Sequence, residues 1–329
     1  MDGVRAAVDR ALEASVVGSF TRIGPSVRSR LFRWEPPATH RMDGKVSIVT
    51  GATSGLGRVT ARELARLGSR VVVLVRDAER GHAVGREIAA TTGSDDVMVV
   101  AADMGDLDSV RRAADALRDL SHIDVLIHNA GALSRTREVS PQGIEQTVAA
   151  QLLGPFLLTN LVGAQLSNVA SRVIFVTSGG MYIEPLHVNS LEMSAATYDG
   201  VTAYARVKRA QVSLVERWAP QLDHLAITMA AMHPGWADTP GVRTSLPSFR
   251  RVVGPLLRSP SEGADTIVWL ASAPGAGSPS GSLWLDRRQR SPHRLRRTRR
   301  SDTVAERARL WTFCCERSGI TSDELAALA

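Results

Sequence analysis

A tyrosine and a lysine stand four positions apart in the run Tyr204-Ala-Arg-Val-Lys208. If this run is helical, the two side chains share one helix face, because residues four apart lie one turn from each other. A phenol ionises near pH 10, and a nearby ammonium group stabilises its anion, so the pair could transfer a proton at neutral pH. The same spacing also occurs by chance on exposed helices. The neighbouring Tyr198 has only Thr202 at the equivalent position.

Several polar residues stand where apolar runs of the sequence end. Asp103 follows VMVVAA, Asn129-Ala130-Gly131 follows VLIH, and Ser178 ends RVIFVTS. Ligands of open α/β sheets bind at the carboxyl ends of the strands, so these residues are candidates for a binding edge, and the serine hydroxyl could hold a carbonyl oxygen. Each has a structural alternative: a helix cap for Asp103, a turn bonding its own backbone for Asn129, and a turn serine for Ser178.

The apolar run KVSIVT, residues 45–50, leads directly into the glycine-rich TGATSGLG. Glycine permits a tight turn and a close approach to a pyrophosphate, and the helix that follows offers free N–H groups and a partial positive charge. Three glycines at this spacing predict a dinucleotide site, whereas one or two could serve a plain strand-to-helix turn. The predicted cofactor-binding residues of this turn are Gly51, Ser54, Gly55, Leu56 and Gly57.

Arg76, at the end of the second apolar run, is predicted to select the cofactor. It stands about 20 residues beyond the glycines, where a dinucleotide fold meets the adenosine ribose. An arginine offers a charged fork to a 2′-phosphate, whereas an acid would accept hydrogen bonds from a free 2′-hydroxyl. Arg76 therefore favours NADP(H) over NAD(H). Asp77 beside it could cap the next helix or bind a ribose.

From Lys45 onward, short β-branched apolar runs alternate with longer amphipathic stretches. This alternation is typical of a parallel sheet wound with helices, so we expect a Rossmann-type, doubly wound α/β fold in a single domain. The stretch LDSVRRAADALRDL, opened by acidic residues, is predicted to be one of the helices. The predicted strands are residues 45–50, 70–75, 97–103, 125–130, 172–178, 226–234 and 282–286.

The composition favours a protein without a membrane span. Hydrophobic residues make up 44% of the 329 residues, yet no uninterrupted apolar run reaches the roughly 18 residues that a bilayer requires. The first residues mix charges with apolar positions, unlike a secretion signal, so a cytoplasmic location is expected. The two cysteines, Cys314 and Cys315, are neighbours and predict neither a disulfide nor a metal site.

Two flanks lie outside the alternating pattern, so the chain divides into an N-terminal extension (1–42), a dinucleotide-binding domain (43–286) and a C-terminal extension (287–329). Residues 19–34 combine basic and bulky apolar side chains, which is typical of helices at a membrane interface. Packing against the main domain is the alternative that we prefer. The bulky residues concerned are Phe20, Ile23, Leu31, Phe32 and Trp34.

The net charge of +7 arises largely from one segment, Arg287 to Arg300, which contains eight arginines. Clustered arginines can bind nucleic acid or another anionic surface. A solvated surface is the commoner role of such a run, so nucleic-acid binding is not expected. The basic character belongs to this segment and not to the core.

The motifs TGATSGLG, HNAG, VTSGG, Tyr204-xxx-Lys208 and HPGWADT follow one another in the order of the short-chain dehydrogenase/reductase family, which the chain resembles from about residue 45 to 286. SFTRIGPSVRSRLFRW, YDGVTAYARVKRAQV and GSLWLDRR are similar to the subgroup of dehydrogenase/reductase family member 12-like proteins. The resemblance implies that Tyr204 is the general acid in reduction and the base in oxidation, that Lys208 also bonds the nicotinamide ribose, and that Ser178 orients the carbonyl. It places beside the nicotinamide carboxamide Pro234, Gly235 and Thr239.

One position departs from the family pattern, because Gln151 stands where the family usually has an asparagine. In the family, that asparagine holds a water that links the lysine to solvent. The longer glutamine is expected to shift or weaken this proton relay, and we include it among the catalytic candidates. The long interval between Ser178 and Tyr204 is expected to form a loop over the site and to shape the substrate pocket.

The sequence thus predicts an NADP(H)-dependent oxidoreductase that transfers a hydride between the nicotinamide and a small carbonyl or alcohol substrate, centred on Ser178, Tyr204 and Lys208. An apolar substrate would suit membrane contact through residues 19–34, and a homo-oligomer is left open. Two other functions stay open: a catalytically silent dinucleotide-binding redox sensor, and a binder of nucleic acid or an anionic surface through Arg287 to Arg300. No metal site is predicted.

Overall fold

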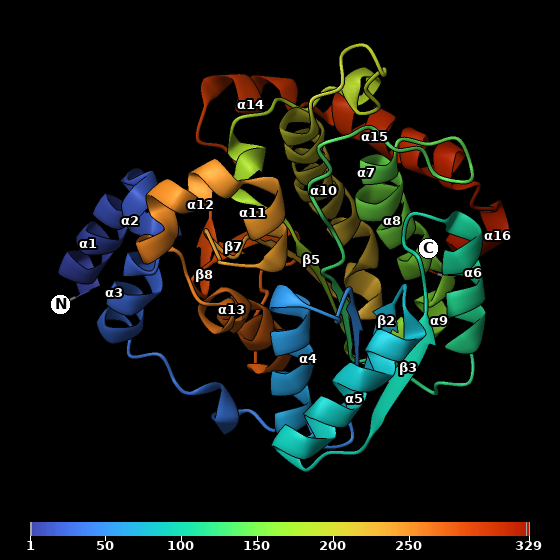
Figure 1. Cartoon of the computed structure of the whole chain (residues 1–329), viewed down its shortest axis with the longest axis horizontal. Helices are drawn as coiled ribbons and strands as arrows, with labels where there is room; N and C mark the ends of the chain where they lie inside the picture. Colours follow the sequence, from blue (N-terminus) through green and yellow to red (C-terminus); the bar gives the residue numbers. More distant parts are fainter. Residues whose placement is uncertain (1, 327, 329) are drawn as a thin grey trace.

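The structure, a computed structural model, describes residues 2–326 and 328. Its described residues form an eight-stranded sheet with the order β3-β2-β1-β4-β5-β6-β7-β8, in which neighbours are parallel except for β7 and β8 (Figure 1). The predicted Rossmann-type, doubly wound α/β fold is therefore confirmed. The strands are β1 Val46–Thr50, β2 Arg70–Val75, β3 Val97–Ala101, β4 Val125–His128, β5 Arg172–Val176, β6 Thr228–Met232, β7 Ser282–Leu285 and β8 Arg288–Arg290.

The central strands are buried on both faces, which explains their continuous apolar sequences. All residues of β1 are buried, and Arg70 is the exposed residue of β2. A parallel sheet that is covered by helices on both sides hides both sets of alternating side chains. The strand order reverses between β1 and β4, and ligands of such sheets bind in the crevice beyond the carboxyl ends at that point.

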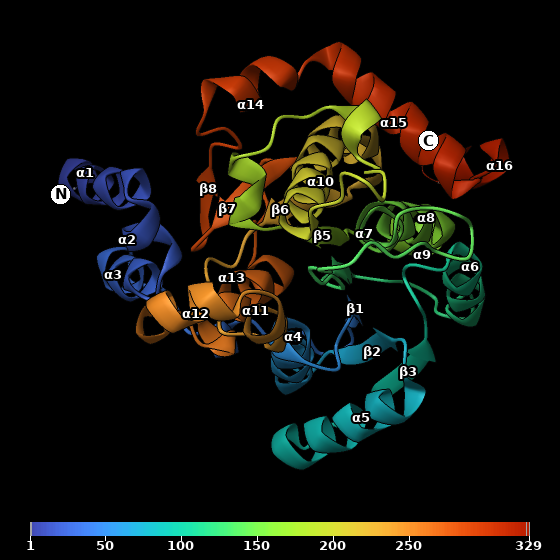
Figure 2. The ribbon, with the colours of Figure 1, turned by 45° about the horizontal axis from the view of Figure 1, so that its top comes forward.

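Helices cover both faces of the sheet (Figure 2). One layer consists of α4 Gly55–Arg66, α5 Ala78–Thr92 and α13 Pro260–Ser272, and the other of α6 Leu107–Ala116, α7 Gln146–Val148, α8 Gly154–Leu161, α9 Gly163–Ser167, α10 Gly200–Leu222 and α15 Val304–Ser318. In the first layer, Leu64, Ile88 and Ile267 pack on the sheet. In the second, Phe156 and Trp218 are among the largest fully buried side chains.

The two flanks are also helical. The remaining helices are α1 Asp2–Ala14, α2 Val16–Phe20, α3 Ile23–Leu31, α11 Pro240–Ser245, α12 Pro247–Val253, α14 Arg296–Ser301 and α16 Ser322–Ala326. The N-terminal helices lie beside α12 in Figures 1 and 2, and the Arg22 N–H donates to the carbonyl oxygen of Leu256, just beyond α12, at 3.0 Å. No helix in the described part of the chain is long and apolar enough to cross a lipid bilayer.

The predicted strands agree with the structure except at their ends, where several predicted runs continue as loops. The helix predicted after the third strand forms as α6, although it ends at Ala116. The eighth strand lies outside the predicted set. It forms a hairpin with β7, whose two turn residues, Asp286 and Arg287, have φ of 52° and 54°. The expected border at 286/287 therefore falls inside a hairpin turn.

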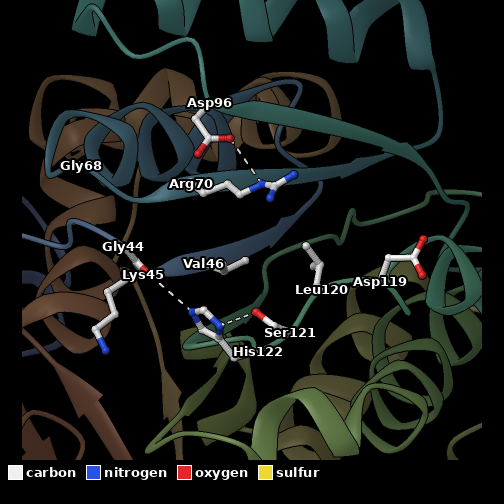
Figure 3. A pocket seen from close by; sticks show the side chains of 10 residues that line it. All are labelled: Gly44, Lys45, Val46, Gly68, Arg70, Asp96, Asp119, Leu120, Ser121 and His122. Atoms are coloured by element: carbon white, nitrogen blue, oxygen red, sulfur yellow. Dashed lines mark hydrogen bonds and ion pairs between the residues drawn. The ribbon is translucent and has the colours of Figure 1, made fainter.

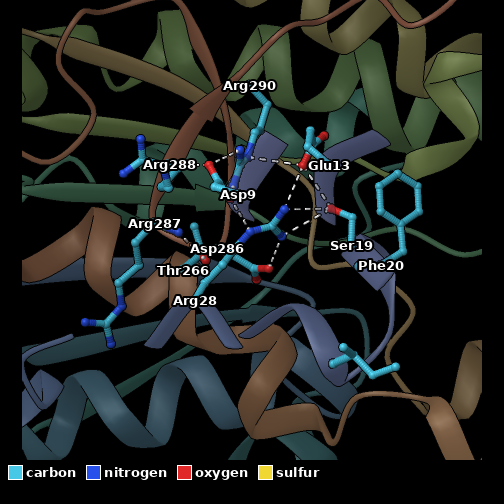
Figure 4. A network of polar contacts seen from close by, with 12 residues as sticks. Asp9, Glu13, Ser19, Phe20, Arg28, Thr266, Asp286, Arg287, Arg288 and Arg290 are labelled. Atoms are coloured by element: carbon cyan, nitrogen blue, oxygen red, sulfur yellow. Dashed lines mark hydrogen bonds and ion pairs between the residues drawn. The ribbon is translucent and has the colours of Figure 1, made fainter. Parts of the chain in front are cut away.

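A network of buried ion pairs joins the N-terminal helices to this hairpin (Figure 4). The fully buried Arg28 of α3 donates to Asp9 of α1 at 2.7 Å and to Asp286 at 2.6 Å. Arg290 of β8 bonds Asp9 at 2.8 Å, and Arg258 bonds Asp286 at 2.6 Å. The two flanks are therefore joined to each other and to the sheet.

The arginine-rich segment divides into a paired half and an exposed half. Ion pairs to Asp9, Glu13 or Asp265 are formed by Arg287, Arg288, Arg290 and Arg294. The exposed arginines are Arg296, Arg297, Arg299 and Arg300. The interpretation as a solvated run therefore holds only for the second half, because acids from α1 and α13 neutralise the first.

Most of the bulky N-terminal side chains pack against the main domain, which is the alternative that we prefer to membrane contact. Phe20 is buried, and Phe32 and Trp34 lie against arginines. The guanidinium of Arg288 is 4.1 Å from the ring centre of Phe32, and that of Arg287 is 4.6 Å from the ring of Trp34. Ile23 differs from these residues, because it stays 39% exposed on the surface.

Candidate active site

The glycine-rich turn between β1 and α4 is built tightly against the end of β4. Gly51 and Gly55 have φ of 69° and 56°, a region that residues with a Cβ rarely adopt. A Cβ on Gly51 would lie 2.8 Å from the Cα of Ala130, and a Cβ on Gly57 would meet the Gly51 carbonyl and the Asn129 amide. Glycine is therefore required here to bring the two strand ends together.

The start of α4 keeps backbone N–H groups that suit an anion. Ser54, which precedes the helix, is exposed and makes no capping hydrogen bond. The N-terminus of a helix carries a partial positive charge, so a pyrophosphate could be held there, and the missing Cβ atoms leave room for its approach. Leu56 packs instead toward α13, since a Cβ on Gly263 would lie 2.7 Å from its Cδ2. The residues present fit the phosphate part of a dinucleotide.

Asn129 fixes the end of β4 to the end of β1. Its amide donates to the carbonyl oxygens of Thr50 at 3.0 Å and of Gly51 at 3.3 Å. The Thr50 hydroxyl accepts from the N–H groups of Asn129 and Ala130 at 3.0 and 2.9 Å. The alternative in which Asn129 bonds its own backbone is wrong, because its side-chain partners come from β1 and the turn after it.

The two acids near the sheet edge serve the backbone that follows them. Asp77 caps α5, and its carboxylate accepts from the Arg80 N–H at 3.0 Å, so the capping alternative for Asp77 is confirmed. Asp103 accepts from the Gly105 N–H at 2.9 Å in the turn after β3. The capping alternative for Asp103 is wrong, because α6 is capped by Asp106.

Arg76 is exposed at the end of β2. Among the residues that the structure describes, none forms an ion pair or a hydrogen bond with its guanidinium. A guanidinium at this position can therefore bind an incoming anion without first breaking a contact within the protein.

Ser178, Tyr204 and Lys208 meet beyond the carboxyl end of β5. Helix α10 is capped by Asp199 and carries the tyrosine and the lysine on successive turns, with the ammonium nitrogen 5.3 Å from the phenol ring centre. The Ser178 hydroxyl lies close enough to the Tyr204 phenol to lower the pKa of the phenol. The structure thus brings the three predicted residues into one cluster.

The ammonium group of Lys208 is buried and donates to the carbonyl oxygen of Val176 at 3.0 Å. Burial lowers the pKa of Lys208 to about 7. Burial also raises the pKa of Tyr204, and the neighbouring Ser178 hydroxyl offsets only part of this effect. The expectation that Lys208 lowers the phenol pKa is not met, because burial disfavours the ammonium and the phenolate alike.

Gln151 lies in a π-helical turn, Ala149–Leu153, just before α8. Its side chain donates to the carbonyl oxygen of Ala132 at 2.8 Å. Its Oε1 has no hydrogen-bond partner among the described residues and lies 2.6 Å from where a Cβ on Gly131 would be. The amide is therefore turned toward the segment after β4 and not toward Lys208.

Gln211, which lies three residues beyond Lys208, connects this turn to α10. Its side-chain amide donates to the backbone carbonyl oxygen of Gln151. π-helical turns displace backbone groups from the regular ladder and are frequent at functional sites. Gln211 is absent from the predicted site, although its helical spacing from Lys208 would have placed it on the same face.

The segment 234–239 after β6 covers the glycine-rich turn. Gly235 has φ of 72° and is packed against the Arg258 guanidinium, which leaves no space for a Cβ. Thr239 caps α11 and lies next to Gly55, since a Cβ on Gly55 would be 3.5 Å from the Thr239 Cβ. The predicted cofactor residues after β6 thus lie beside those after β1.

Residues 45–248 match the family model for short chain dehydrogenases. The chain belongs to the short-chain dehydrogenase/reductase family. It is 39% identical to human dehydrogenase/reductase SDR family member 12, over 77% of this chain and 80% of that protein. It is 32% identical to human retinol dehydrogenase 11, over 91% of this chain and 93% of the relative.

Several solved structures show the same fold. A Mycobacterium paratuberculosis protein aligns with a TM-score of 0.69 and 28% identity, over 87% of this chain and 97% of its own. A Brucella melitensis 3-ketoacyl-(acyl-carrier-protein) reductase with NADH gives 0.59 and 25%, over 73% and 96%. A Beutenbergia cavernae protein with bound NADP gives 0.63 and 25%, over 76% and 97%. The chain is an oxidoreductase that acts on CH–OH or C=O groups, in a family that binds NAD(P).

In this short-chain dehydrogenase, a cleft of about 420 Å³ opens beside the start of α10. Val201 lines it and precedes Tyr204 by three residues, so the two lie one turn apart on the same helix face. The Ser245 hydroxyl donates to the Leu133 carbonyl oxygen at 2.8 Å, which joins α11 to the opposite wall. Other lining residues are Arg135, Leu246, Pro247 and Phe249.

A second hollow, of about 320 Å³, lies at the opposite edge of the sheet (Figure 3). Its walls include Val46 and Arg70, the first residues of β1 and β2. Arg70 pairs with Asp96 at 3.3 Å, and Lys45 pairs with Asp124 at 2.9 Å. Because ligands of such sheets bind at the carboxyl ends of the strands, this hollow is not the active site.

The long interval between β5 and α10 is bound to the C-terminal helices. The Leu186 N–H donates to the Ser301 hydroxyl at 2.9 Å, and the Val188 N–H to the Glu306 carboxylate at 2.7 Å. The residue of this interval that lines the cleft is Asp199, at its C-terminal end. The pocket wall expected from the interval is therefore provided mainly by α11, α12 and the segment after β4.

Proposed function

We propose that this oxidoreductase interconverts a small carbonyl compound and the corresponding alcohol with NADP(H), and that Tyr204 is its proton donor and acceptor. One observation carries the proposal: the Ser178 hydroxyl lies close enough to the Tyr204 phenol to lower its pKa, and Lys208 lies one helical turn behind the phenol. When bound, the cofactor supplies or accepts the hydride.

The hydroxyls of Ser178 and Tyr204 would hold the substrate oxygen. Because the two hydroxyls are close neighbours, a carbonyl oxygen that enters between them can accept from both. In reduction, Tyr204 gives its proton to this oxygen as negative charge develops, and in oxidation the phenolate takes the proton from the alcohol. A raised pKa suits the first role, since the phenol is then protonated at neutral pH.

Lys208 would stabilise the phenolate that remains after the proton has left. Because burial lowers its pKa to about 7, the lysine gives up its proton far more readily than an exposed lysine. Anionic phosphates bound nearby would favour its ammonium form. We place Gln151 in the same relay through its backbone carbonyl, which Gln211 holds, because its side chain is engaged with Ala132.

NADP(H) is the proposed cofactor because Arg76 is exposed at the ribose end of the predicted site. A charged fork there would bind a 2′-phosphate. The remaining proposed cofactor contacts are the glycine-rich turn, with Asp103, Asn129, Ala130 and Gly131 at the neighbouring strand ends and Pro234, Gly235 and Thr239 across from them.

An apolar substrate is supported by two observations. Leu133, Val201 and Phe249 line the cleft. Retinol dehydrogenase 11, a relative by sequence, is named for an apolar alcohol. We therefore propose an apolar aldehyde, ketone or alcohol as the substrate class.

Oxidation of NADPH by a panel of carbonyl compounds, followed by absorbance, tests the proposed function. Turnover that needs both a carbonyl and the intact Tyr204 would support it. NADPH binding without turnover on any compound would instead favour the silent redox sensor. Salt-dependent nucleic-acid binding that is lost on truncation after Asp286 would favour the arginine-rich segment as the functional part.

We further propose that the enzyme is cytoplasmic and contacts anionic membranes through the face formed by α2, α3 and α12. Arg28 and Arg258 are buried, and Arg243 and Arg250 pair with Asp238. The other arginines of this face are exposed and suit an anionic lipid surface: Arg22, Arg30, Arg33 and Arg251. Val252→Asp should reduce co-sedimentation with phosphatidylserine vesicles, and equal binding to phosphatidylcholine would contradict the proposal. The exposed apolar residues of this face are Val16 (43%), Val17 (49%), Ile23 (39%), Val252 (81%) and Leu256 (39%).

A further inference from the structure

Phe20, the last residue of α2, is a buried aromatic residue outside the family match at 45–248. Only 4% of its surface is exposed. Its ring centre lies 4.5 Å from that of His233 and 5.8 Å from that of Trp236, both in edge-to-face geometry. These two residues enclose the turn that is proposed to lie beside the nicotinamide.

The backbone of Phe20 is bonded to the same turn. Its carbonyl oxygen accepts from the Trp236 N–H at 2.7 Å and from the buried Arg258 guanidinium at 3.1 Å. The Arg258 N–H donates in turn to the Trp236 carbonyl oxygen at 2.8 Å. Trp236 is therefore held from both sides, and this part of the contact does not depend on the Phe20 ring.

The ring of Phe20 also lies behind the proposed catalytic serine. Gly179 follows Ser178 directly, and a Cβ on Gly179 would lie 2.7 Å from Cε2 of the ring. The ring thus occupies the space that a side chain at position 179 would need. Figure 4 shows Phe20 beside the ion-pair network that anchors the N-terminal helices.

An aromatic path continues from Phe20 to the cleft. Trp236 packs edge to face on Phe249 with ring centres 5.1 Å apart, and Phe249 lines the cleft. Edge-to-face pairs stabilise a particular orientation of the two rings in addition to burying their surface. A change at Phe20 would therefore reach the cleft wall through a single intervening ring.

We propose that Phe20 is a positioning residue for this enzyme: its ring holds Trp236 and, through it, Phe249, and so sets the shape of the substrate cleft. The effect on turnover rests on the proposed function, whereas the effect on the cleft wall does not. Recognition of the carbonyl substrate then depends on a side chain from the N-terminal flank. The cofactor side keeps its anchor, since the backbone bonds of Phe20 survive a side-chain substitution.

The test compares Phe20→Leu with Phe32→Leu as a matched control. Phe32 belongs to the same flank, but its ring lies against Arg288, away from Trp236. In hydrogen exchange of the ligand-free proteins, Phe20→Leu should lose protection in peptides covering 236–249, and Phe32→Leu should not. This readout needs no substrate, so it remains valid if the proposed carbonyl chemistry is wrong.

With a carbonyl substrate found in the NADPH screen, Phe20→Leu should raise the carbonyl KM on the order of 10- to 100-fold and change the NADPH Kd by less than about threefold. Unchanged protection at 236–249, or the same loss in both variants, would overturn the proposal. An NADPH Kd that rises as much as the carbonyl KM would also overturn it, because the ring would then serve the cofactor side or the fold as a whole.

Discussion

The carboxyl edge of the sheet and the ion-pair network at the β7–β8 hairpin hold charged groups in opposite ways. At the edge, Arg76 has no ion pair within the described residues, and Lys208 donates to one backbone carbonyl. In the network, the partners of Arg28 are Asp9, Glu13, Ser19 and Asp286. The charged side chains of the ion-pair network thus have several hydrogen-bond and ion-pair partners, whereas those of the candidate site have few and can bind a ligand.

Burial explains this difference. A buried charge loses hydration worth several kcal/mol unless opposite charges and hydrogen bonds replace it. Burial alone would raise the pKa of Asp9, but hydrogen bonds from Arg290 and Arg28 lower it to about 2. Lys208 is also buried but has no acid beside it among the described residues, so its pKa falls to about 7. Burying Lys208 without an acid therefore costs stability at the site, whereas the charges of the ion-pair network are compensated. Functional sites commonly carry such a cost.

The largest effect is expected for Tyr204→Phe, which deletes the hydroxyl and keeps the ring. Positioned acid or base groups contribute about 100- to 10,000-fold, so turnover should fall by at least that range. NADPH affinity should stay nearly unchanged, because the glycine-rich turn and Arg76 are intact. Turnover and NADPH binding measured on the same preparation test this, and more than about a tenth of normal turnover would exclude Tyr204 as the principal proton donor.

Lys208→Ala is the companion variant. It should lose turnover and also NADPH affinity, because the family resemblance implies that the ammonium bonds the nicotinamide ribose. Unchanged NADPH affinity in Lys208→Ala would show that the lysine acts on the Tyr204 phenol and does not bind the cofactor.

In the ion-pair network at the β7–β8 hairpin, Asp286→Asn should reduce stability rather than turnover. Asparagine also tolerates the left-handed turn conformation, so the hairpin should form, but Arg28 and Arg258 would lose a buried carboxylate. The free energy of unfolding in urea should fall by about 3 to 5 kcal/mol. Asp43→Asn, which removes the exposed partner of Arg41, should change it little. Equal effects of the two substitutions would remove the contrast between saturated and exposed pairs.

Arg76→Leu tests the carboxyl edge of the sheet, where this arginine has no ion pair within the described residues. Removing one charged partner of a phosphate costs roughly 1.5 to 3 kcal/mol, so NADPH binding should weaken by about 10- to 150-fold. NADH binding should change little, because NADH lacks the 2′-phosphate. Titration of both cofactors against both proteins measures the difference. Equal losses for NADPH and NADH would refute the assignment of Arg76.

The low pKa of Lys208 predicts how stability depends on pH. Between the folded pKa of about 7 and the ordinary value of 10.5, the unfolded chain keeps a proton that the folded chain has lost. The cost of burying this lysine is therefore complete below pH 7 and declines as pH rises, by up to about 1.4 kcal/mol per unit. Urea unfolding from pH 6.5 to 9.5 should show a steeper rise for the native protein than for Lys208→Met. Parallel curves would mean that the lysine titrates normally.

The smallest effect is expected for Gln151→Asn. Its backbone carbonyl, which Gln211 holds, is retained, so turnover should change by less than about tenfold. The bond from the side chain to Ala132 would be lost or distorted, which should cost about 1 to 3 kcal/mol of stability because the amide is buried. A tenfold fall in turnover would show that the glutamine side chain itself belongs to the proton relay.

Several parts of the site follow from spacing within short segments. Tyr204 and Lys208 are one helical turn apart, and the glycines of TGATSGLG suit only a tight strand-to-helix turn. The apolar runs predict parallel strands, and the residues at their ends then share one edge. These inferences succeed because each depends on backbone geometry over a few residues.

Other parts depend on partners that are distant in the chain. RRQR reads as a solvated run, yet Arg290 is buried because Asp9, 281 residues away, lies beside it. Phe20 belongs to a segment, 19–34, whose basic and apolar composition is typical of membrane-interface helices, yet its ring packs on Trp236 and His233.

The sequence by itself therefore determined the fold class, the glycine-rich turn and the spacing of the tyrosine and the lysine. Only the tertiary structure decided which charges are saturated, that burial shifts both Lys208 and Tyr204 toward their neutral forms, and that the N-terminal flank packs behind Ser178. The physical reason is that a helical turn leaves a periodic trace in the sequence, whereas burial and pairing across the chain depend on every element that packs at the same place.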